Sequence, residues 1–430
     1  MTDANARDRV VHDFDHLGPE FNANWATMST EMASERPVSW SPRHDGFWMI
    51  AAFDAVIEAG SDPTRFSSVR DGIVGDPFAE RDKMNDLAND LTQAPARQGF
   101  SIPSNGPYYP RFVPTESDPP LHTGIRRLEV PFFSPKAVRA QEPGVRRNID
   151  RAIDAFIEDG YADFSHQLAM VVPTQTTLKL IGFDEDDWEP LANVVHAMGM
   201  GLPQTGELFT QMRERIVALV EDRAREPRSD LASALLQGKI MGTAVTKDEA
   251  NTILNGITFA STDTTAATLL HGLRYLSAHE QMRAQIIADL SLIPNFIEEV
   301  LRLHAPFFGT ARTVVRDTEL GGQQLEAGER VMLGFGPGNR DPRKFADPDT
   351  LKLDRENSRD HLTFGVAHHR CLGAPLARME LKIMFEEILA RLPDFHVDEA
   401  GIVEYPHKAI NGYDKLPATF TPAARKDATA

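Results

Sequence analysis

The chain has 430 residues and a formal net charge of −18 at pH 7, which argues against nucleic acid or an anionic membrane as the main partner. Its apolar fraction is 41% with tyrosine counted, and about 46% when the 6 Tyr are exchanged for the 29 Gly, which is typical of a folded globular protein. No apolar run reaches the roughly 18 residues of a membrane span. The polar start and the single cysteine, Cys371, which cannot form an internal disulfide, predict a soluble cytoplasmic protein without a secretion signal.

Short elements and a long loop are predicted for the first 120 residues. Apolar periodicity and chain breakers indicate helices at residues 21–35 and 53–59, and strands at 38–40 and 47–51. From Asp71 to Pro120, Pro, Gly, Asn and Asp are too frequent for regular structure. A loop this long inside a compact enzyme usually covers something. This one carries the aromatic residues Phe100, Tyr108, Tyr109 and Phe112.

Helical patterns dominate the rest of the chain. They predict helices at residues 120–130, 143–159, 162–181 around Pro173, 186–198 and 206–225. Strand-like segments return only late, at residues 310–315, 330–333 and 418–420. The predicted fold class is therefore mainly α with a smaller β-rich part.

The longest predicted helix begins at a capping-box sequence, Thr246-Lys-Asp-Glu249, and continues to about His279. At 1.5 Å per residue it would be roughly 50 Å long and would cross the domain. The polar segment Ser261-Thr-Asp-Thr-Thr265 interrupts it, and hydroxyl side chains there can bend a helix by competing for its carbonyl groups. Two interpretations stay open: an exposed face with Asp263 in solvent, or a functional bend, which the central position of the helix favours.

The only cysteine lies just before another predicted helix, which continues to about Leu392. The dipole and free N–H groups of a helix N-terminus stabilise a thiolate, and Pro375 suits the first turn. Gly365 and Gly373 allow the backbone to pass close to a flat object or around the sulfur. A lone cysteine is more often an inert buried side chain, but these surroundings favour a functional thiolate.

Several segments resemble motifs of the cytochrome P450 family. The segment Phe364-Gly-Val-Ala-His-His-Arg-Cys371-Leu-Gly373 is similar to the family's haem-binding loop, Phe-Gly-x-Gly-x-His-x-Cys-x-Gly. The resemblance covers about residues 20–420. Its other motifs follow in the family's order: residues 118–126, the long-helix segment 260–265, Glu299-Val-Leu-Arg302 with Pro306, Arg312, and Asn339-Arg-Asp-Pro342.

Two residues depart from the family pattern. Ala367 stands where the cysteine loop usually has glycine, and its methyl group is tolerable if φ is negative. Ser261 replaces a glycine of the long-helix signature, so a hydroxyl group could shape the oxygen groove there. The acid and the alcohol of that signature, Asp263 and Thr264, are both retained.

The resemblance implies a triangular-prism fold, with residues 1–430 in one domain and flexible ends at residues 1–18 and 423–430. It also implies haem b as the cofactor, with Cys371 as the axial ligand of the iron. Asp263 and Thr264 would relay protons on the opposite face, and Glu299 with Arg302 would form a structural ion pair. The propionates would be bound by four basic residues, His122, Arg126, Arg312 and His369.

The function that the resemblance implies is insertion of one oxygen atom of dioxygen into a hydrophobic organic molecule. The substrate wall would include Ile257, Ala260, Phe307, Phe308 and Ile410, together with the loop from Phe100 to Phe112. The two adjacent phenylalanines indicate a compact or flat substrate. Alternative functions are a peroxide-driven peroxygenase, a haem carrier or sensor without turnover, and a thiol hydrolase. The retained acid and alcohol disfavour the peroxygenase, and the lack of an effector domain disfavours the carrier or sensor. The haem-loop pattern disfavours the thiol hydrolase.

Electrons are expected to come from a separate ferredoxin with its reductase. Because both this chain and a ferredoxin are acidic, docking would need a local positive patch on the cysteine side of the haem. The candidates for this patch are Arg127, Arg370, Arg378 and Lys382. Of these, Arg378 is the one most expected to be held in an ion pair instead.

Overall fold

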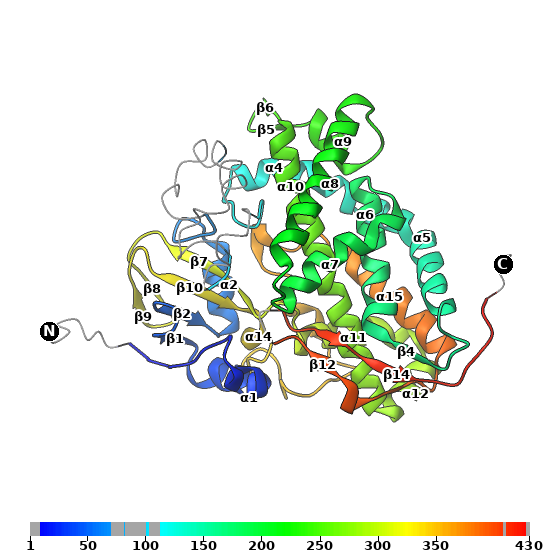
Figure 1. The fold of residues 1–430 in the computed structure, drawn as a ribbon. Helices are drawn as coiled ribbons and strands as arrows, with labels where there is room; N and C mark the ends of the chain where they lie inside the picture. Colours follow the sequence, from blue (N-terminus) through cyan, green and yellow to red (C-terminus); the bar gives the residue numbers. More distant parts are fainter. Residues whose placement is uncertain (1–8, 70–80, 82–99, 103–111, 407–409, 427–430) are drawn as a thin grey trace.

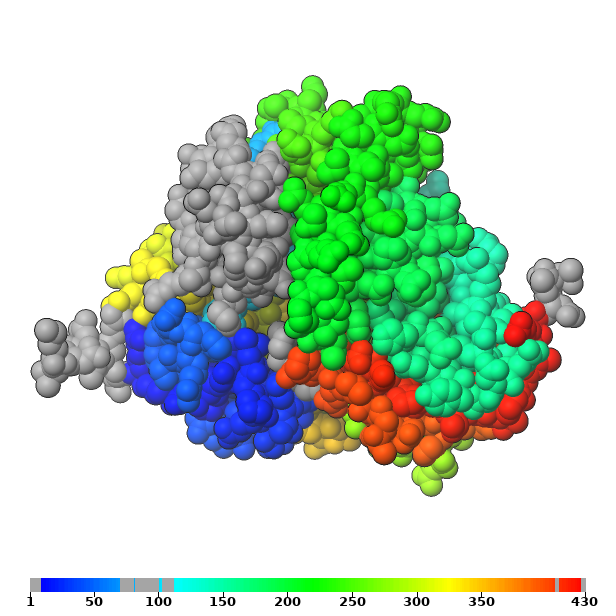
Figure 2. All heavy atoms as spheres, viewed as in Figure 1, coloured from blue at the N-terminus to red at the C-terminus, as the bar shows by residue number. Residues whose placement is uncertain are grey.

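A five-stranded sheet and a larger group of helices form the two parts of the molecule (Figure 1). The computed structural model describes residues 9–69, 81, 100–102, 112–406 and 410–426. In Figure 2 the molecule is broad along α1 (Pro19–Glu35) and the C-terminal strands, and it narrows toward α9 (Leu231–Gln237). This tapering outline and the mainly helical content confirm the predicted fold class.

The sheet joins strands from both ends of the chain in the order β1-β2-β10-β7-β3. Only the β2–β10 pair is parallel among these neighbours, with Val331 opposite Trp48. Pairing of β10 with β7 places Arg312 opposite Val331. The strands are β1 (Val38–Ser41), β2 (Phe47–Ile50), β3 (Phe66–Ser67), β7 (Gly309–Val314) and β10 (Arg330–Gly334).

Most of the helices lie beside the sheet, and in the chain they come between its strands β3 and β7 (Figure 1). The N-terminal and middle ones are α2 (Phe53–Ser61), α4 (Leu121–Glu129), α5 (Pro135–Asp154), α6 (Val171–Ile181), α7 (Trp188–Gly199) and α8 (Thr205–Arg225). The later ones are α10 (Lys247–Ser261), α11 (Asp263–Ala278), α12 (Glu280–Ala288), α13 (Ile293–Leu303), α14 (Phe335–Gly338) and α15 (Ala374–Arg391). No helix among the described residues is both long enough and apolar enough to cross a membrane.

Short strands complete the fold. A three-stranded sheet has the order β11-β14-β4, and the remaining strands pair in twos, β12 with β13, β5 with β6 and β8 with β9. Their bounds are β4 (Tyr161–Asp163), β5 (Lys239–Ile240), β6 (Thr243–Ala244), β8 (Thr318–Leu320), β9 (Gln323–Leu325), β11 (His396–Val397), β12 (Val403–Glu404), β13 (Tyr413–Lys415) and β14 (Pro417–Thr419).

The largest core cluster lies where α11 passes α13 and α15. Leu269 and Leu273 of α11 are buried there against Phe296 of α13 and Phe385 of α15. Gly272 makes the close approach possible, since a Cβ atom there would lie 2.5 Å from Cζ of Phe385. A larger side chain would push α15, and with it the cysteine loop, away from α11.

Two predicted helices have different bounds in the structure. α5 begins at Pro135, eight residues before the predicted start, because the Ser134 hydroxyl caps it by accepting from Ala137 N at 3.4 Å. Pro143 therefore lies inside this helix and does not begin it. The predicted helix at 162–181 is split into β4, a π-helical turn at Ser165–Ala169 and α6. Pairing of residues 161–163 with β14 overrides the helical pattern.

The described parts of both predicted flexible ends make contacts. Val11 bridges to Trp40, the N–H of Trp40 donates to Val10 O at 2.8 Å, and Phe14 is buried. At the other end, Ala423 N donates to Ile157 O at 3.2 Å. The described residues of the N-terminal end therefore pack on the fold, whereas residues 423–426 are exposed and contact it by hydrogen bonds.

Candidate active site

The long predicted helix is two helices that meet at Thr262. Thr246 and Glu249 form the expected capping box at the start of α10, whereas Thr262 has φ −85° and ψ −69°. Beside this break, the Ser261 hydroxyl donates to Thr258 O at 2.9 Å and the Thr264 hydroxyl donates to Ala260 O at 3.1 Å. The structure therefore confirms the bend and shows hydroxyl groups bound to its carbonyls.

Asp263, the first residue of α11, is buried at this break. Its Oδ2 accepts a hydrogen bond from the Tyr405 hydroxyl at 3.0 Å, and its Oδ1 has no partner among the described residues. Burial raises the pKa of Asp263 to about 7, although the bond from Tyr405 opposes the shift. The alternative with Asp263 in solvent is wrong, and this carboxyl group can carry a proton near neutral pH.

One cavity joins this helix break to the cysteine loop. Its empty space, including the part open to solvent, is about 1760 Å³. Thr264 and Ala260 line it on the helix side and Cys371 lines it on the loop side. Of the other predicted site residues, the structure brings these to the same cavity: Ile257, Phe307, His122, Arg126, Arg312, His369, Phe100 and Phe112.

The thiol of Cys371 is accessible from the cavity and enclosed by protein on its other sides. Cys371 N donates to Phe364 O at 2.7 Å, which closes the loop below the sulfur. Burial raises the pKa of the thiol, and hydrogen bonds from the N–H groups of Gly373 and Ala374 partly offset the increase. The start of α15 thus supplies the backbone donors that the sequence predicted.

The cysteine loop holds a non-glycine residue in the left-handed region. Ala367 has φ +49°, so the condition under which its methyl group was expected to be tolerable is not met. Gly365 has φ +68°, and a Cβ atom there would lie 3.2 Å from His369 O. The departure at Ala367 therefore adds backbone strain to the loop that carries the thiol.

Replacing Ala367 by glycine is expected to stabilise the protein by about 1 kcal/mol, because glycine adopts a positive φ without a steric cost. Thermal unfolding of the purified protein measures the change as an increase in the midpoint temperature. The control is Ala424→Gly at an exposed position with no positive φ, where no gain is expected. An unchanged or lower midpoint in Ala367→Gly would show that the loop is relaxed with alanine.

Basic side chains gather at one edge of the cavity. The ring of His122 lies 4.6 Å from that of His369 and 5.2 Å from that of His368, between ring centroids. Burial lowers the pKa of His122 to about 3 and that of Arg312 to about 10. The guanidinium group of Arg312 donates, among the described residues, only to neutral oxygens of Thr310 and Ala311. Asp118 is the carboxylate that acts on Arg312 here, and it is outnumbered by the basic side chains, so this edge suits a further anionic group.

His369 and Arg126 are also fixed at this edge. His369 Nε2 lies 2.8 Å from the Ser68 hydroxyl, and Arg126 donates to Arg370 O at 2.8 Å. His368, which the sequence left without a role, contacts both other histidines of the cluster. Its buried Nε2 has no partner among the described residues.

The predicted substrate wall is only partly formed by the residues named for it. Phe307 lines the cavity, but Phe308 packs away from it against Phe21, with ring centroids 4.9 Å apart. Neighbouring side chains of an extended segment point to opposite sides, so the pair does not form a double aromatic wall. Ile410 is buried in a backbone bridge with Phe307 and does not line the cavity. Tyr108 and Tyr109 lie outside the described residues.

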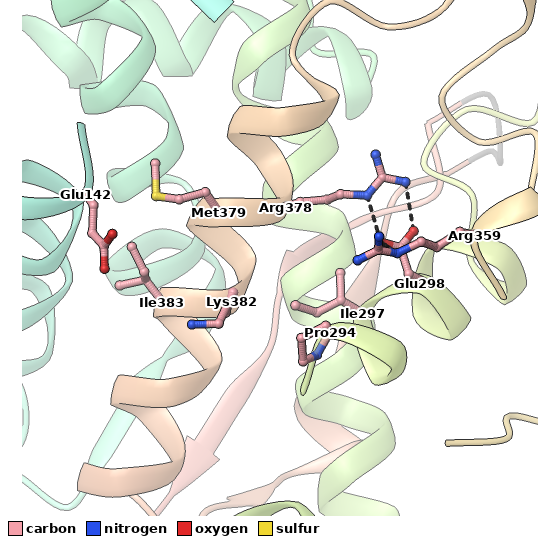
Figure 3. Close-up of a pocket in the computed structure, with 9 residues that line it drawn as sticks. All are labelled: Glu142, Pro294, Ile297, Glu298, Arg359, Arg378, Met379, Lys382 and Ile383. Atoms are coloured by element: carbon pink, nitrogen blue, oxygen red, sulfur yellow. Dashed lines mark hydrogen bonds and ion pairs between the residues drawn. The ribbon is translucent and has the colours of Figure 1, made fainter. Parts of the chain in front are cut away.

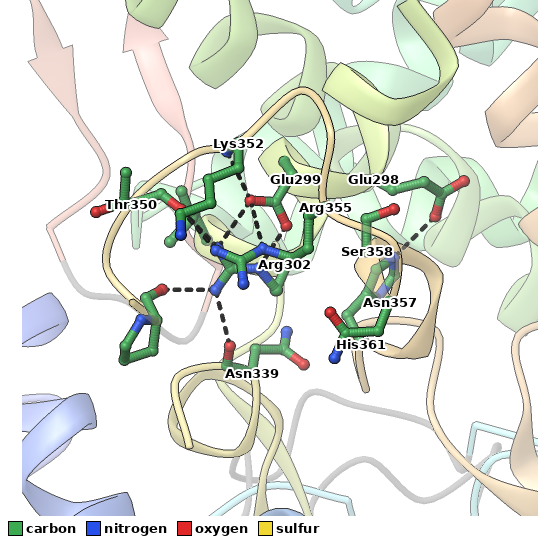
Figure 4. A network of polar contacts seen from close by, with 12 residues as sticks. Glu298, Glu299, Arg302, Asn339, Thr350, Lys352, Arg355, Asn357, Ser358 and His361 are labelled. Atoms are coloured by element: carbon green, nitrogen blue, oxygen red, sulfur yellow. Dashed lines mark hydrogen bonds and ion pairs between the residues drawn. The ribbon is translucent and has the colours of Figure 1, made fainter. Parts of the chain in front are cut away.

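The predicted ion pair of Glu299 and Arg302 lies at the centre of a buried network (Figure 4). The two side chains form two hydrogen bonds, of 2.6 and 2.9 Å, and both are fully buried. Arg302 also donates to Asn339 O at 3.1 Å, and Arg355 contacts Glu299 at 3.0 Å. The pair thus ties α13 to the segment that precedes the cysteine loop.

Glu298, next to this pair, binds the cysteine loop and α15 and was not predicted. It accepts two hydrogen bonds from Arg378, of 2.7 and 2.8 Å, and lies 3.1 Å from His361 Nε2. Burial opposes ionisation, but the bonds from Arg378 and His361 lower the pKa of Glu298 to about 2. Arg378 is therefore held in an ion pair, as expected, and it stacks on Phe364 beside the cysteine loop.

Buried polar residues that no motif marked also reach the site. Glu129 and Glu380 line the cavity, and burial raises the pKa of Glu129 to about 7 and that of Glu380 well above its usual value. Tyr405 reaches Asp263 from a segment 142 residues away. These residues have no local sequence signal, because tertiary contacts alone bring them to the site.

Comparisons with known proteins agree with this geometry. A family model described as Cytochrome P450 matches residues 187–401. A steroid C26-monooxygenase of Mycolicibacterium smegmatis is 33% identical over 324 residues, 72% of this chain and 79% of that protein. A methyl-branched lipid omega-hydroxylase of Mycobacterium bovis is 29% identical over 410 residues, 90% of this chain and 89% of that protein. The solved structure of cytochrome P450 CYP109Q5 from Chondromyces apiculatus has 26% identity and a TM-score of 0.79, covering 96% of this chain and 99% of its own.

Proposed function

Since the chain belongs to the cytochrome P450 family of haem-thiolate monooxygenases, we propose that it inserts one oxygen atom of dioxygen into a bulky hydrophobic molecule bound in the cavity described above. The observation that carries the proposal is the placement of Cys371 and Thr264 on the walls of one cavity. A group bound between them would contact the thiolate on one face and the helix break on the other.

The residues around the cavity fit a haem group. Cys371 offers the sulfur ligand for the iron, and the space extends from it to the break between α10 and α11. The buried cation of Arg312 and the histidine cluster, at one edge, suit two carboxylate groups. We assign His122, Arg126, Arg312 and His369 to the propionates.

Asp263 and Thr264 are assigned to proton delivery. Haem held by Cys371 would supply the iron chemistry of dioxygen, with electron density from the thiolate. Asp263 is neutral below a pH of about 7 and can then give up a proton from its carboxyl group. Thr264 lines the cavity, and we propose that its hydroxyl group passes this proton on or holds a water molecule.

The cavity walls support a hydrophobic substrate. Phe100, Phe112, Phe259, Ile257 and Phe307 contribute the apolar lining above the helix break. The relatives described above act on a steroid and on methyl-branched lipids, according to their names. We therefore propose a substrate of that bulk and polarity, larger than the compact molecule that the adjacent phenylalanines first indicated.

Substrate binding can be tested by the change in the haem absorption spectrum that accompanies displacement of water from the iron. Three probes of different bulk should be titrated: a sterol, a methyl-branched fatty acid and a compact monoterpene alcohol. We expect a saturable spectral change with the sterol or the branched fatty acid and a weaker one with the monoterpene. Tightest binding of the monoterpene would contradict the proposed substrate class.

A separate, acidic electron carrier of the ferredoxin type is proposed as the partner, in a cytoplasmic setting that keeps the thiol reduced. A groove with apolar and charged walls lies between α5, α13 and α15, the helix that follows the cysteine loop (Figure 3). Ile297, Met379 and Ile383 supply apolar surface there, and Lys382 and Arg359 supply positive charge. Part of this charge is neutralised, because Glu298 pairs with both Arg378 and Arg359 and Glu386 pairs with Lys382. Glu142 also lines the groove.

Reversing the charge at Arg127, an exposed residue of α4, is expected to slow the first electron transfer about tenfold at low ionic strength. Stopped-flow reduction by a reduced ferredoxin measures the rate, whose dependence on salt should become flatter. The matched control is Arg225→Glu at the exposed end of α8, which packs mainly against α7, α9 and α10. Equal rates in Arg127→Glu and Arg225→Glu would show that the partner docks elsewhere.

A further inference from the structure

The hydroxyl group of Tyr405 lies between the buried carboxyl group of Asp263 and the imidazole ring of His196 on α7. The Tyr405 oxygen is 3.0 Å from Asp263 Oδ2 and 3.2 Å from His196 Nδ1. The other ring nitrogen of His196, Nε2, lies 2.9 Å from Asp414 Oδ1. These contacts form an unbroken hydrogen-bond chain of four side chains.

We infer that Tyr405 and His196 form the path by which protons reach Asp263 from solvent. This inference rests on the proposed role of Asp263 in proton delivery. The exposed fraction increases along the path, from 4% for Asp263 and 6% for Tyr405 to 12% for the side chain of His196 and 42% for that of His166. The rings of His166 and His196 are 5.0 Å apart, so the outer end of the path reaches the surface.

The aromatic ring of Tyr405 is held in place by two glycines. A Cβ atom at Gly199 would lie 2.7 Å from Tyr405 Cε2, and one at Gly412 would lie 3.1 Å from the same atom. Tyr405 N also donates to Gly412 O at 3.1 Å. The hydroxyl group is therefore fixed between its two partners by close packing around the ring.

The proton balance of one transfer follows from these contacts. Protonated His196 donates from Nε2 to Asp414 and from Nδ1 to the Tyr405 oxygen. The Nδ1 proton moves to that oxygen while the hydroxyl proton of Tyr405 moves to Asp263 Oδ2. One N–H and one O–H bond break, two O–H bonds form, and His196, Tyr405 and Asp263 all end neutral. To repeat the transfer, the ring of His196 rotates so that the bare Nδ1 faces the side of Asp414 and His166, where it takes a new proton from solvent and the proton on the other nitrogen faces Tyr405.

The charges around the path favour this direction of transfer. Burial, followed by the nearby His166, lowers the pKa of His196 despite the opposing effect of Asp414, and burial raises that of Asp263. Both shifts favour a neutral imidazole and a protonated carboxyl group. The other charged groups that face the outer end are Asp163, bonded to His166 at 3.0 Å, and Lys415.

The first test replaces Tyr405 by phenylalanine in the haem-loaded enzyme. We expect the rate of product formation to fall about tenfold, with more of the consumed electrons lost as hydrogen peroxide and an altered solvent deuterium isotope effect. The matched control is Tyr413→Phe, because Tyr413 is also buried and bonded to a histidine, His271, at 2.9 Å but does not contact Asp263. Equal effects of the two substitutions would overturn the inference.

A second readout does not depend on turnover. The infrared carbonyl band of protonated Asp263, identified by its loss in Asp263→Asn, should titrate near pH 7 in the parent protein. In Tyr405→Phe the titration should move upward by about one unit, because the hydroxyl donor that stabilises the carboxylate is lost. An unmoved titration would show that Tyr405 does not act on this carboxyl group.

His196→Gln keeps a hydrogen-bonding side chain that cannot carry a proton. If both residues belong to one path, the double variant Tyr405→Phe, His196→Gln should be no slower than the slower single variant. Additive losses would indicate two independent structural effects and would contradict the path. If Asp263→Asn has no effect on turnover, the proposed role of Asp263 in proton delivery is wrong. If Asp263→Asn slows turnover but Tyr405→Phe and His196→Gln do not, only the proposed path is wrong.

The outer end of the path has a competing interpretation as a cation site, because donor atoms of His166, His196 and Asp414 lie within 4.8 Å of one another. Treatment of the haem enzyme with EDTA distinguishes the two interpretations. The proton path predicts unchanged turnover and an unchanged solvent isotope effect after treatment. Loss of activity with EDTA and its recovery with zinc chloride would replace the path by a metal site.

Discussion

Substitution of Cys371 by serine is expected to abolish the thiolate-type spectrum of the reduced carbon monoxide complex and to reduce oxygenation to background. A serine hydroxyl is not ionised at neutral pH and donates less electron density than a thiolate, so the iron would lose the ligand that supports cleavage of dioxygen. The chain has no other cysteine to take its place. Absorption spectra and product analysis with a chemically reduced sample measure both effects.

The control for this substitution is a measurement that the variant is still folded. Because the Cys371 side chain faces the cavity and its N–H bonds to Phe364 O through the backbone, serine should leave the loop and the helix content unchanged. Circular dichroism checks this expectation. A thiolate-type spectrum retained in Cys371→Ser would refute the assignment of the ligand and of the haem position.

Substitution of Asp263 by asparagine is expected to lower the rate of product formation on the order of 100-fold, since the side chain can no longer donate an acidic proton. Thr264→Ala should still bind haem and substrate but release most consumed electrons as hydrogen peroxide. Electron consumption, peroxide and product, measured in one reaction, separate slow turnover from loss of coupling. A peroxide-driven peroxygenase would instead keep its peroxide-supported rate in both variants.

The pKa of Asp263 predicts how the coupling of electrons to product changes with pH. The pKa of Asp263 is raised to about 7, so the carboxyl group holds its proton below that pH and loses it above. Coupling of electrons to product should therefore fall as the pH increases through about 7, and Asp263→Asn should remove this dependence. For Thr264→Ala, the matched control is Thr174→Ala, because the hydroxyl group of Thr174 in α6 also donates to the carbonyl four residues back, that of Met170, but Thr174 does not line the cavity. Equal losses in Thr264→Ala and Thr174→Ala would contradict the assigned role.

Ser261 tests whether Thr264 acts alone. Both residues line the cavity, and each hydroxyl group donates to a helix carbonyl, that of Ser261 to Thr258 O at 2.9 Å and that of Thr264 to Ala260 O at 3.1 Å. If the Ser261 hydroxyl group partly takes over from Thr264, Ser261→Gly combined with Thr264→Ala should lose more coupling than Thr264→Ala alone.

Local spacing explains which parts of the site could be predicted from the sequence. The cysteine before a helix, the pair Glu299 and Arg302 three residues apart, and the bend around Ser261 are each determined by neighbours along the chain. The direction of Phe308 depends on how the segment after α13 enters the sheet, which periodicity does not encode. Tyr405 meets Asp263 only through tertiary folding, so no local pattern marks it.

The fold shows the same limit. Long periodic helices such as α8 and α15 were predicted close to their observed bounds, because burial of one face is visible in the sequence. Two-residue strands such as β5 and β6 were missed, since pairing with another strand defines them. At residue 367 the sequence identified the departure from glycine, but only the structure supplies the positive φ.

Because Cys371 lies on the cavity wall, the reactivity of its thiol reports how much of the protein lacks the cofactor. The chain has one sulfhydryl group, and in the assigned arrangement it is blocked when haem is bound and open to the cavity when it is not. A chromogenic thiol reagent would therefore count empty molecules directly, with no background from other cysteines. The same exposure makes empty molecules the fraction prone to oxidation or cross-linking between chains during storage. Alkylation before an assay would permanently block Cys371 in the molecules without haem and would not modify the haem-loaded enzyme.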